Sequence, residues 1–103
     1  QSFIFSLSQN FRTHHSVSFY AAEQCLTPRY FSTIVREKSG RNALQWIMMF
    51  IIAEAKKLLS DPDPSIKEIA ETLGFSNQSF FGRYFKQYVG LSPMAFRSSG
   101  TKE

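Results

Sequence analysis

The strongest constraint on the fold of this chain is an internal repeat, in which residues 17–40 match residues 66–90. Before and within the predicted turn the two copies lie 49 positions apart, and the matched pairs are Ala21 with Ala70, Leu26 with Phe75, and Thr27 with Ser76. After the turn the spacing is 50, and the matched pairs are Phe31 with Phe81, Ile34 with Tyr84, Val35 with Phe85, Arg36 with Lys86, and Gly40 with Gly90. The second copy is therefore interpreted as having one extra residue after its helix cap. Each copy is typical of a helix, a short turn and a second helix, with a small alanine that lets the two helices cross closely.

The first half of the chain predicts three helices from apolar spacing and capping residues. The apolar residues of the first helix share one face that we expect to be core, and they are Phe3, Ile4, Leu7 and Phe11. Ser16 is the expected N-cap of a second helix, whose partly inward residues are Phe19, Tyr20, Ala22 and Cys25. Thr27 followed by Pro28 begins a third helix, which Gly40 ends as its C-terminal cap.

A long fourth helix is predicted over residues 42–59, and the Asp-Pro-Asp-Pro sequence at residues 61–64 stops it because neither proline has a backbone N–H to donate. Ser65 and Glu68 form a Ser-x-x-Glu capping box, which begins a fifth helix that runs through Leu73. The fourth helix would be about 27 Å long at ~1.5 Å per residue, which is close to the ~34 Å of one turn of duplex DNA.

The rest of the chain predicts two more helices. A turn at residues 74–76 precedes a sixth helix over about residues 77–89, Gly90 caps it, and Ser92-Pro93 begins a short last helix. The predicted fold class is all-α, with seven helices and no strand, and with two helix-turn-helix units joined by a long connecting helix. The expected boundaries are residues 1–41 for the first unit, 42–60 for the connecting helix and 61–103 for the second unit.

The longest apolar run, Trp46 to Ala53, is eight residues and so is well short of the ~20 needed to cross a bilayer. We therefore expect no membrane partner. Because the run is more apolar than a helix with one exposed side needs, two interpretations remain open. Either it is fully buried between the two units, or part of it faces a regulatory domain, in which case Met48 or Met49 would be exposed in the isolated chain.

The formal net charge is +4, and its distribution is uneven along the chain. Residues 26–45 carry four basic side chains against one acid, residues 46–73 carry three against five, and residues 74–103 carry four against one. Two basic blocks separated by an acidic stretch are expected where two surfaces face a polyanion such as DNA. An ordinary solvated surface is the alternative on charge alone.

The second helix of each unit has a polar stripe opposite its apolar face. We predict that these stripes read DNA bases through Arg29, Ser32, Thr33, Gln78, Ser79, Gly82 and Arg83. Arginine binds guanine with two hydrogen bonds, glutamine binds adenine, serine or threonine serves either base, and a glycine permits close approach. Predicted phosphate contacts are Arg36, Lys86, Thr27 and Ser76. The alternative is that each stripe is only a solvent face.

The remaining chemistry of the chain is sparse. The one cysteine, Cys25, is expected to be a small buried filler, and His14 and His15 are adjacent with no metal-ligand partner at suitable spacing. Most of the eleven phenylalanines recur at core spacing, so we prefer core packing to base stacking for them. Without paired carboxylates, an activated nucleophile or a phosphate-cradling loop, we expect no enzyme, no cofactor and no metal site.

These features resemble the AraC/XylS family of bacterial regulators over essentially the whole chain. The most specific stretch is IAETLGFSNQSFFGRYFKQYVGLSPMAFR at residues 69–97, and LTPRYFSTIVREKSG at residues 26–40 is also close to the family pattern. The resemblance implies a seven-helix reading head that binds double-stranded DNA through both recognition helices, each in one of two successive major grooves. It also implies a sensor or dimerisation domain on the N-terminal side, contact with RNA polymerase, and a cytoplasmic protein that is associated with the nucleoid when bound.

Two positions depart from the family pattern. The first recognition helix often carries Arg where this chain has Thr33, so Arg29 is expected to supply more of the base discrimination of that helix. The connecting helix often carries Arg where this chain has Ile51. The main rival function is a helical protein-interaction module that binds a partner helix in an aromatic groove.

Overall fold

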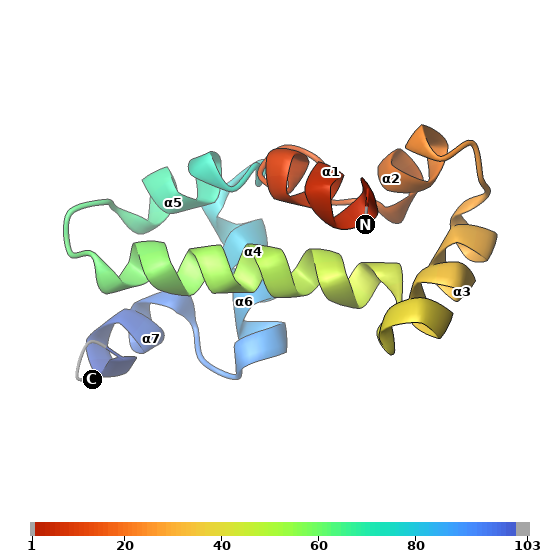
Figure 1. Cartoon of the computed structure of the whole chain (residues 1–103). Helices are drawn as coiled ribbons and strands as arrows, with labels where there is room; N and C mark the ends of the chain where they lie inside the picture. Colours follow the sequence, from red (N-terminus) through yellow and green to blue (C-terminus); the bar gives the residue numbers. More distant parts are fainter. Residues whose placement is uncertain (1, 101–103) are drawn as a thin grey trace. The chain divides into compact units, whose positions relative to one another are not determined.

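The computed structural model describes residues 2–100 of the chain, and side-chain burial for residues 3–99. The described residues form seven helices and no strand, which confirms the predicted all-α class. The helices, labelled in Figure 1, are α1 (Ser2–Asn10), α2 (Val17–Glu23), α3 (Pro28–Ser39), α4 (Ala43–Ser60), α5 (Ile66–Thr72), α6 (Gln78–Val89) and α7 (Pro93–Gly100).

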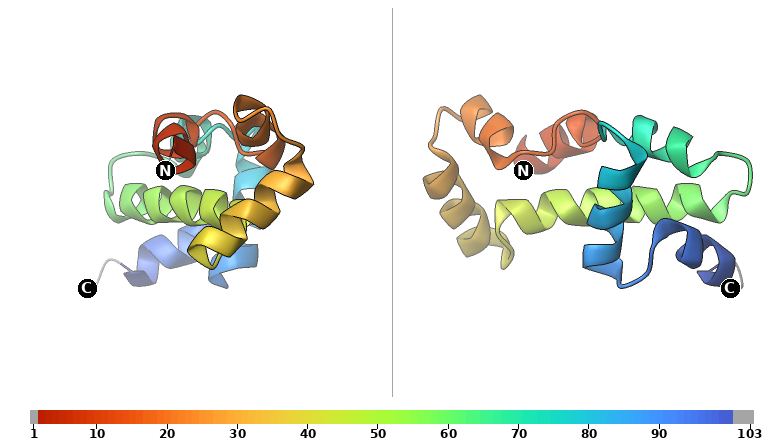
Figure 2. Two further views of the ribbon diagram at one scale, coloured as in Figure 1. Left: turned by 45° about the vertical axis from the view of Figure 1, so that its right-hand side comes forward. Right: turned by 180° about the vertical axis from the view of Figure 1, so that it is seen from behind.

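The chain divides into two compact units, Gln1–Ile51 and Ile52–Glu103, with the boundary inside α4. Unit 1 contains α1, α2, α3 and the first part of α4. Unit 2 contains the second part of α4, then α5, α6 and α7. In each unit the second helix of the helix-turn-helix pair, α3 or α6, runs across the direction of the first (Figure 2). Each unit therefore surrounds its own helix pair with a preceding and a following helix.

The core of unit 1 forms where α1, α2 and α3 meet. Phe3 makes edge-to-face contacts with Tyr20 at 5.5 Å and with Phe31 at 5.1 Å between ring centroids. Leu7 is also fully buried. Ile4 was expected in this core, but it is 38% exposed, because the α1 face that packs inward is narrower than the apolar stripe of the sequence. That expectation was wrong.

The core of unit 2 is built largely from α5 and α6, and its buried residues there are Ile66, Ile69, Ala70, Leu73, Phe81 and Phe85. Arg97 of α7 fastens the loop after α4. Its guanidinium and Nε donate hydrogen bonds to the backbone oxygens of Leu59 at 3.1 Å, Asp61 at 2.8 Å and Pro64 at 2.7 Å. This loop contains the Asp-Pro-Asp-Pro stop that the sequence predicted.

Most predicted caps are confirmed. The Ser16 and Thr27 side chains accept hydrogen bonds from the backbone N–H of the third residue of α2 and of α3, respectively. Both halves of the Ser65 and Glu68 capping box are present. Gly40 and Gly90 end α3 and α6 in the left-handed conformation, which glycine adopts without a steric penalty.

The cap of α6 differs from the expectation. Asn77, not Ser76, is the N-cap, and its side-chain oxygen accepts a hydrogen bond from the Phe80 N–H at 2.9 Å. Asn77 therefore matches Thr27, and the extra residue of the second copy is Ser76, which precedes the cap. The interpretation that the extra residue follows the cap was wrong, because Asn and Ser are both good caps and composition does not choose between neighbours.

Cys25 was also placed wrongly. It is exposed because it follows the end of α2 at Glu23, and Ala22, inside α2, is exposed as well. Cys25 has a left-handed backbone conformation with φ 59°, and the matching residue of unit 2 is Gly74 with φ 83°. The turn, not the core, thus determines the environment of this cysteine.

The aromatic and apolar residues are less buried than the spacing suggested. Phe31, Phe81 and Phe85 are buried, but Phe5 is 68% and Phe80 51% exposed. In α4, Met48 and Met49 are half-buried. The interpretation that part of the apolar run faces a regulatory domain stays a prediction.

Candidate nucleic-acid interface

The two helix pairs are joined by turns of the same design. In unit 1 the Leu26 N–H donates to the Ala21 oxygen at 3.0 Å, and in unit 2 the Phe75 N–H donates to the Ala70 oxygen at 3.0 Å. Both alanines are buried at the helix crossing. These bonds close the last turn of the first helix and direct the chain into the second. The local sequence therefore sets how α3 leaves α2 and how α6 leaves α5.

The outer face of α3 presents two of its three predicted base-reading residues to solvent. Arg29 and Thr33 are exposed. The Thr33 hydroxyl donates to the Arg29 backbone oxygen at 3.0 Å, which leaves its oxygen lone pairs facing outward. Arg29 is thus the long, charged donor of this face.

Ser32, the third predicted residue of α3, is half-buried and points toward the start of α4. Its hydroxyl oxygen accepts a hydrogen bond from the Ala43 N–H at 3.4 Å. This N–H belongs to the first turn of α4, where backbone donors have no partner within the helix. The structure therefore gives Ser32 a contact inside unit 1 in addition to its place beside the polar stripe.

The outer face of α6 carries Gln78, Ser79 and Arg83, all exposed. The Arg83 guanidinium lies over the ring of Phe80, 5.0 Å from its centroid. This contact holds the guanidinium on the exposed side of α6. An arginine restrained in this way loses less rotamer entropy when it makes two hydrogen bonds to a guanine.

Gly82 lies in the middle of α6, where glycine costs about 1 kcal/mol relative to alanine. A Cβ atom added there would meet no atom within 4 Å, and the residue has no positive φ. The fold of unit 2 therefore does not require glycine at this position. A requirement from outside the chain, such as close approach of another molecule, would explain it.

The predicted phosphate contacts all lie at the ends of the recognition helices. Arg36 is in the last turn of α3 and Lys86 in the last turn of α6, and both are exposed. Thr27 caps α3, and its oxygen already accepts the Tyr30 N–H at 3.2 Å, which leaves its hydroxyl hydrogen to donate. Ser76 is exposed just before the α6 cap.

Sequence reasoning missed two exposed aromatic residues of the recognition helices. Tyr30 of α3 is 57% exposed and Phe80 of α6 is 51% exposed. They are matched positions of the repeat, each three residues after the helix cap, so the 50-residue spacing contained the signal. Lys67 of α5 was also missed, and it lines a hollow of about 340 Å³ at the start of α6, together with Glu71, Ser76, Asn77, Gln78 and Ser79.

The structure also reduces the basic charge available near α6. Arg97 was counted in the second basic block, but its guanidinium is occupied by backbone oxygens. Lys102 of that block lies outside the described residues. Arg83 and Lys86 are therefore the basic residues of the exposed α6 face, and Lys67 of α5 lies at the start of α6.

The described residues contain no group of three or more metal-ligating side chains close enough to hold an ion. In the same part of the chain, none of the helices combines the length and apolar character of a membrane span.

The chain is similar in sequence and fold to known helix-turn-helix proteins. The helix-turn-helix domain family matches residues 20–99. The arabinose operon regulatory protein of Salmonella typhimurium is 34% identical over 86 residues, which cover 84% of this chain and 31% of that protein. The chain thus spans about a third or less of the length of the curated relatives it matches.

Two solved structures have the same fold. The C-terminal domain of the response regulator yesN from Fusobacterium nucleatum has a TM-score of 0.84 at 22% identity, covering 92% of this chain and 93% of that one. The DNA-binding domain of AdpA, a global transcriptional factor solved in complex with a target DNA, has a TM-score of 0.81 at 26% identity, covering 95% and 88%. With its paired turns, its two capped recognition helices and these relatives, the chain belongs to the AraC-type family of helix-turn-helix transcription regulators.

Proposed function

We propose that this chain binds double-stranded DNA sequence-specifically, as the reading head of a transcription regulator. The observation that carries the proposal is that α3 and α6, which follow turns of the same design, each expose a polar face with an arginine. The AdpA domain, 26% identical to this chain, was solved in complex with its target DNA. The two recognition helices would occupy successive major grooves of one duplex.

In this proposal the exposed arginines read guanine. Arg29 on α3 and Arg83 on α6 each present a planar fork of donors suited to the O6 and N7 atoms of guanine. Gln78 would bind an adenine, and Ser79, Thr33 and Ser32 would add single hydrogen bonds. Gly82 would let a base edge or the sugar-phosphate backbone approach α6 closely.

The sequence-independent part of the affinity would come from phosphate contacts. Arg36 and Lys86 stand near the ends of their helices, and Thr27 and Ser76 have hydroxyls at the two turns. Such contacts release counterions, so binding should weaken steeply as salt is raised. Exposed Tyr30 and Phe80 would lie along the same surface, where an aromatic ring can contact a thymine methyl group.

The chain covers about a third of the length of its relatives. The partners and location of the whole protein are therefore proposals as well. We propose that a sensor or dimerisation domain completes the protein, that RNA polymerase is a partner in regulation, and that the protein works in the bacterial cytoplasm at the nucleoid. The curated relatives are regulators of transcription, and no catalytic role is proposed.

Selection of bound duplexes from a random pool, at a stated salt concentration near ~0.15 M, tests the function directly. The expected result is an enriched motif bound at least about 1,000-fold more tightly than random duplex, with affinity falling as salt rises. Failure to enrich any motif, combined with salt-insensitive capture of a protein partner, would replace this proposal with a protein-interaction module.

A further inference from the structure

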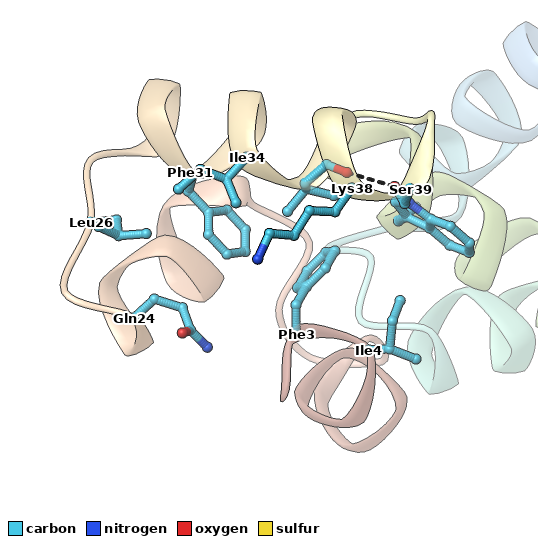
Figure 3. Close-up of a pocket in the computed structure, with 10 residues that line it drawn as sticks. Phe3, Ile4, Gln24, Leu26, Phe31, Ile34, Lys38 and Ser39 are labelled. Carbon is cyan, nitrogen blue, oxygen red and sulfur yellow. Dashed lines mark hydrogen bonds between the residues drawn. The ribbon is translucent and has the colours of Figure 1, made fainter. Parts of the chain in front are cut away.

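Unit 1 contains a pocket of about 310 Å³ on the inner side of α3 (Figure 3). Its walls are mostly apolar and include Phe3, Leu26, Phe31, Ile34 and Trp46, with Lys38 at one side. Small-molecule sites in proteins have volumes of roughly 300–1,000 Å³ and consist of apolar walls with a few polar groups. The pocket is therefore at the small end of the range for a ligand site.

The polar groups of this pocket are few, and only one of them carries a charge. Ser39 is already engaged, because its oxygen accepts the Trp46 indole N–H at 2.8 Å and its hydroxyl donates to the Val35 oxygen at 2.7 Å. The Lys38 side chain extends along the pocket, with its ammonium group on the side where Phe31 and Phe3 lie (Figure 3). Within the described residues, no carboxylate pairs with that ammonium group. Lys38 is exposed to solvent, so its ammonium group can bind the anionic end of a ligand whose apolar part lies in the pocket.

The second copy of the repeat indicates what kind of group would fill this pocket. At the positions that match Leu26, Ile34 and Lys38, unit 2 has aromatic rings, namely Phe75, Tyr84 and Tyr88. These rings contact one another, at 5.2 Å between Phe75 and Tyr84 and 5.0 Å between Tyr84 and Tyr88. Unit 1 has the same turn and the same helix crossing, but smaller or aliphatic side chains at the first two positions. Its pocket thus lies where unit 2 places aromatic side chains of its own.

We propose that the unit 1 pocket binds a small aromatic carboxylic acid, with its ring against Phe3, Phe31 and Ile34 and its carboxylate paired with Lys38. The ring would replace the aromatic packing that unit 2 obtains from its own side chains, and the carboxylate would pair with the exposed Lys38 ammonium group. Such a site lies on the opposite side of α3 from the predicted base-reading residues. It is distinct from the proposed DNA interface and does not depend on it.

Titration of the whole chain with 3-phenylpropionate, in the absence of DNA, tests the proposal. Trp46 is the only tryptophan and lines the pocket, so its fluorescence and its indole N–H resonance report on occupancy. We expect a saturable change at Trp46. Hexanoate, which lacks the ring, and 3-phenylpropionamide, which lacks the charge, should each bind at least about tenfold more weakly.

Two variants separate the parts of the site. Lys38→Met should weaken 3-phenylpropionate about tenfold and leave the amide unchanged, whereas the matched control Lys57→Met, on the exposed side of α4, should change neither. The double variant Ile34→Tyr with Lys38→Tyr copies the unit 2 side chains and should abolish binding while the helical circular dichroism is kept. If that variant does not fold, the effect of Lys38→Met on the affinity for 3-phenylpropionate still tests the proposal.

Three results would overturn the proposal. The first is no saturable change at Trp46 with 3-phenylpropionate. The second is equal affinity for the acid and its amide, or an unchanged affinity in Lys38→Met, since either removes the role of the charge. The third is equal affinity for hexanoate, because the site would then not select a ring. None of these results bears on DNA binding, which the selection from a random pool would test separately.

Discussion

The two helix-turn-helix units share one backbone design but fill it differently. Unit 2 packs aromatic rings around α6 and uses Arg97 to hold the loop after α4. At the position that matches Arg97, unit 1 has Ile47, which is fully buried, and it leaves a pocket beside α3. The caps and turns therefore specify the helix pair, whereas the side chains inside each pair are free to differ.

A second difference between the units, at two residues that contact each other in unit 1, supports this view. In unit 1 Ser32 accepts the backbone N–H of Ala43 at the start of α4. At the matching positions unit 2 has Gly82 and Pro93, so neither the side-chain acceptor nor the backbone donor is present there. The pair was replaced on both sides, and no buried donor is left without a partner by this change.

The largest expected effect is the loss of stability when Arg97 is replaced, because this residue distinguishes the interior of unit 2 from that of unit 1. Arg97→Ala should lower the free energy of unfolding by about 2–4 kcal/mol, because three hydrogen bonds from a charged donor to backbone oxygens are lost. Arg97→Lys should recover only a minor part, since one ammonium cannot reproduce the guanidinium fork. Urea denaturation followed by circular dichroism measures both. Arg41→Ala, which removes an exposed arginine stacked on Trp46, is the control and should cost less than about 1 kcal/mol. A loss below about 0.5 kcal/mol for Arg97→Ala would show that this loop is not held as described.

The next effect compares the two proposed reading faces. Arg83→Ala and Arg29→Ala should each cost about 1–3 kcal/mol on the selected DNA site and much less on random duplex. We expect the Arg83 loss to be the larger, because Phe80 restrains its guanidinium. Competition binding at fixed salt measures both, with Lys57→Ala as control. Equal losses on specific and random DNA would remove these arginines from base reading.

Gly82 offers a test in which stability and function move in opposite directions. Gly82→Ala should stabilise unit 2 by about 0.5–1 kcal/mol, since the added methyl meets no atom and a helical glycine is lost. The same change should weaken DNA binding severalfold if the position allows close approach. Denaturation measures the change in stability, and DNA titration of the same sample measures the change in affinity. Unchanged DNA affinity would mean that Gly82 has no part in the interface.

The turn residues allow a reciprocal exchange of similar size. Cys25→Gly should stabilise unit 1 by about 0.5 kcal/mol, because a left-handed backbone is strained for cysteine and not for glycine. Gly74→Ala at the matched position should destabilise unit 2 by about 1 kcal/mol. Cys25→Asn is a useful control, since asparagine tolerates this conformation. If Gly74→Ala is neutral, the two turns differ more than their hydrogen bonds suggest.

The smallest effect at neutral pH concerns two tyrosines. Burial, with a contribution from Tyr88, raises the pKa of Tyr84 to about 12, and burial, with a contribution from Glu23, raises the pKa of Tyr20 to about 12. Because an unfolded tyrosine ionises near pH 10, stability from each group is complete below pH 10 and is lost as the pH rises toward 12.

Tyr84→Phe should therefore reduce the alkaline loss of stability and change little at pH 7. Tyr20→Phe should also cost stability at pH 7, because the Tyr20 hydroxyl donates to the His14 oxygen at 2.7 Å. Unfolding curves at pH 7 and at pH 11 distinguish the two variants. An identical alkaline loss in wild type and Tyr84→Phe would contradict the assignment.

Much of the fold was predictable because the starts and ends of its helices depend on interactions between residues that are close in sequence. A cap needs one side-chain oxygen and a nearby N–H, so Thr27 and Ser65 could be recognised without tertiary information. The error at Ser76 arose because two capping residues are adjacent, and only the observed bond to Asn77 selects one. The exposure of Arg29, Gln78 and Arg83 also follows from helical spacing and agrees with the expectation, while their roles in base reading stay predictions.

By itself, the sequence determined the number of helices, the repeat and the polar stripes of the two recognition helices, because spacing and capping act over a few residues. Only the tertiary structure decided which apolar residues are covered, as Ile4 and Cys25 illustrate, and that Arg97 holds a loop more than thirty residues away. It also decided that the two similar interiors differ, one filled with rings and the other with a pocket. The physical reason is that burial and cavity shape depend on what distant segments place against a residue, which no local pattern contains.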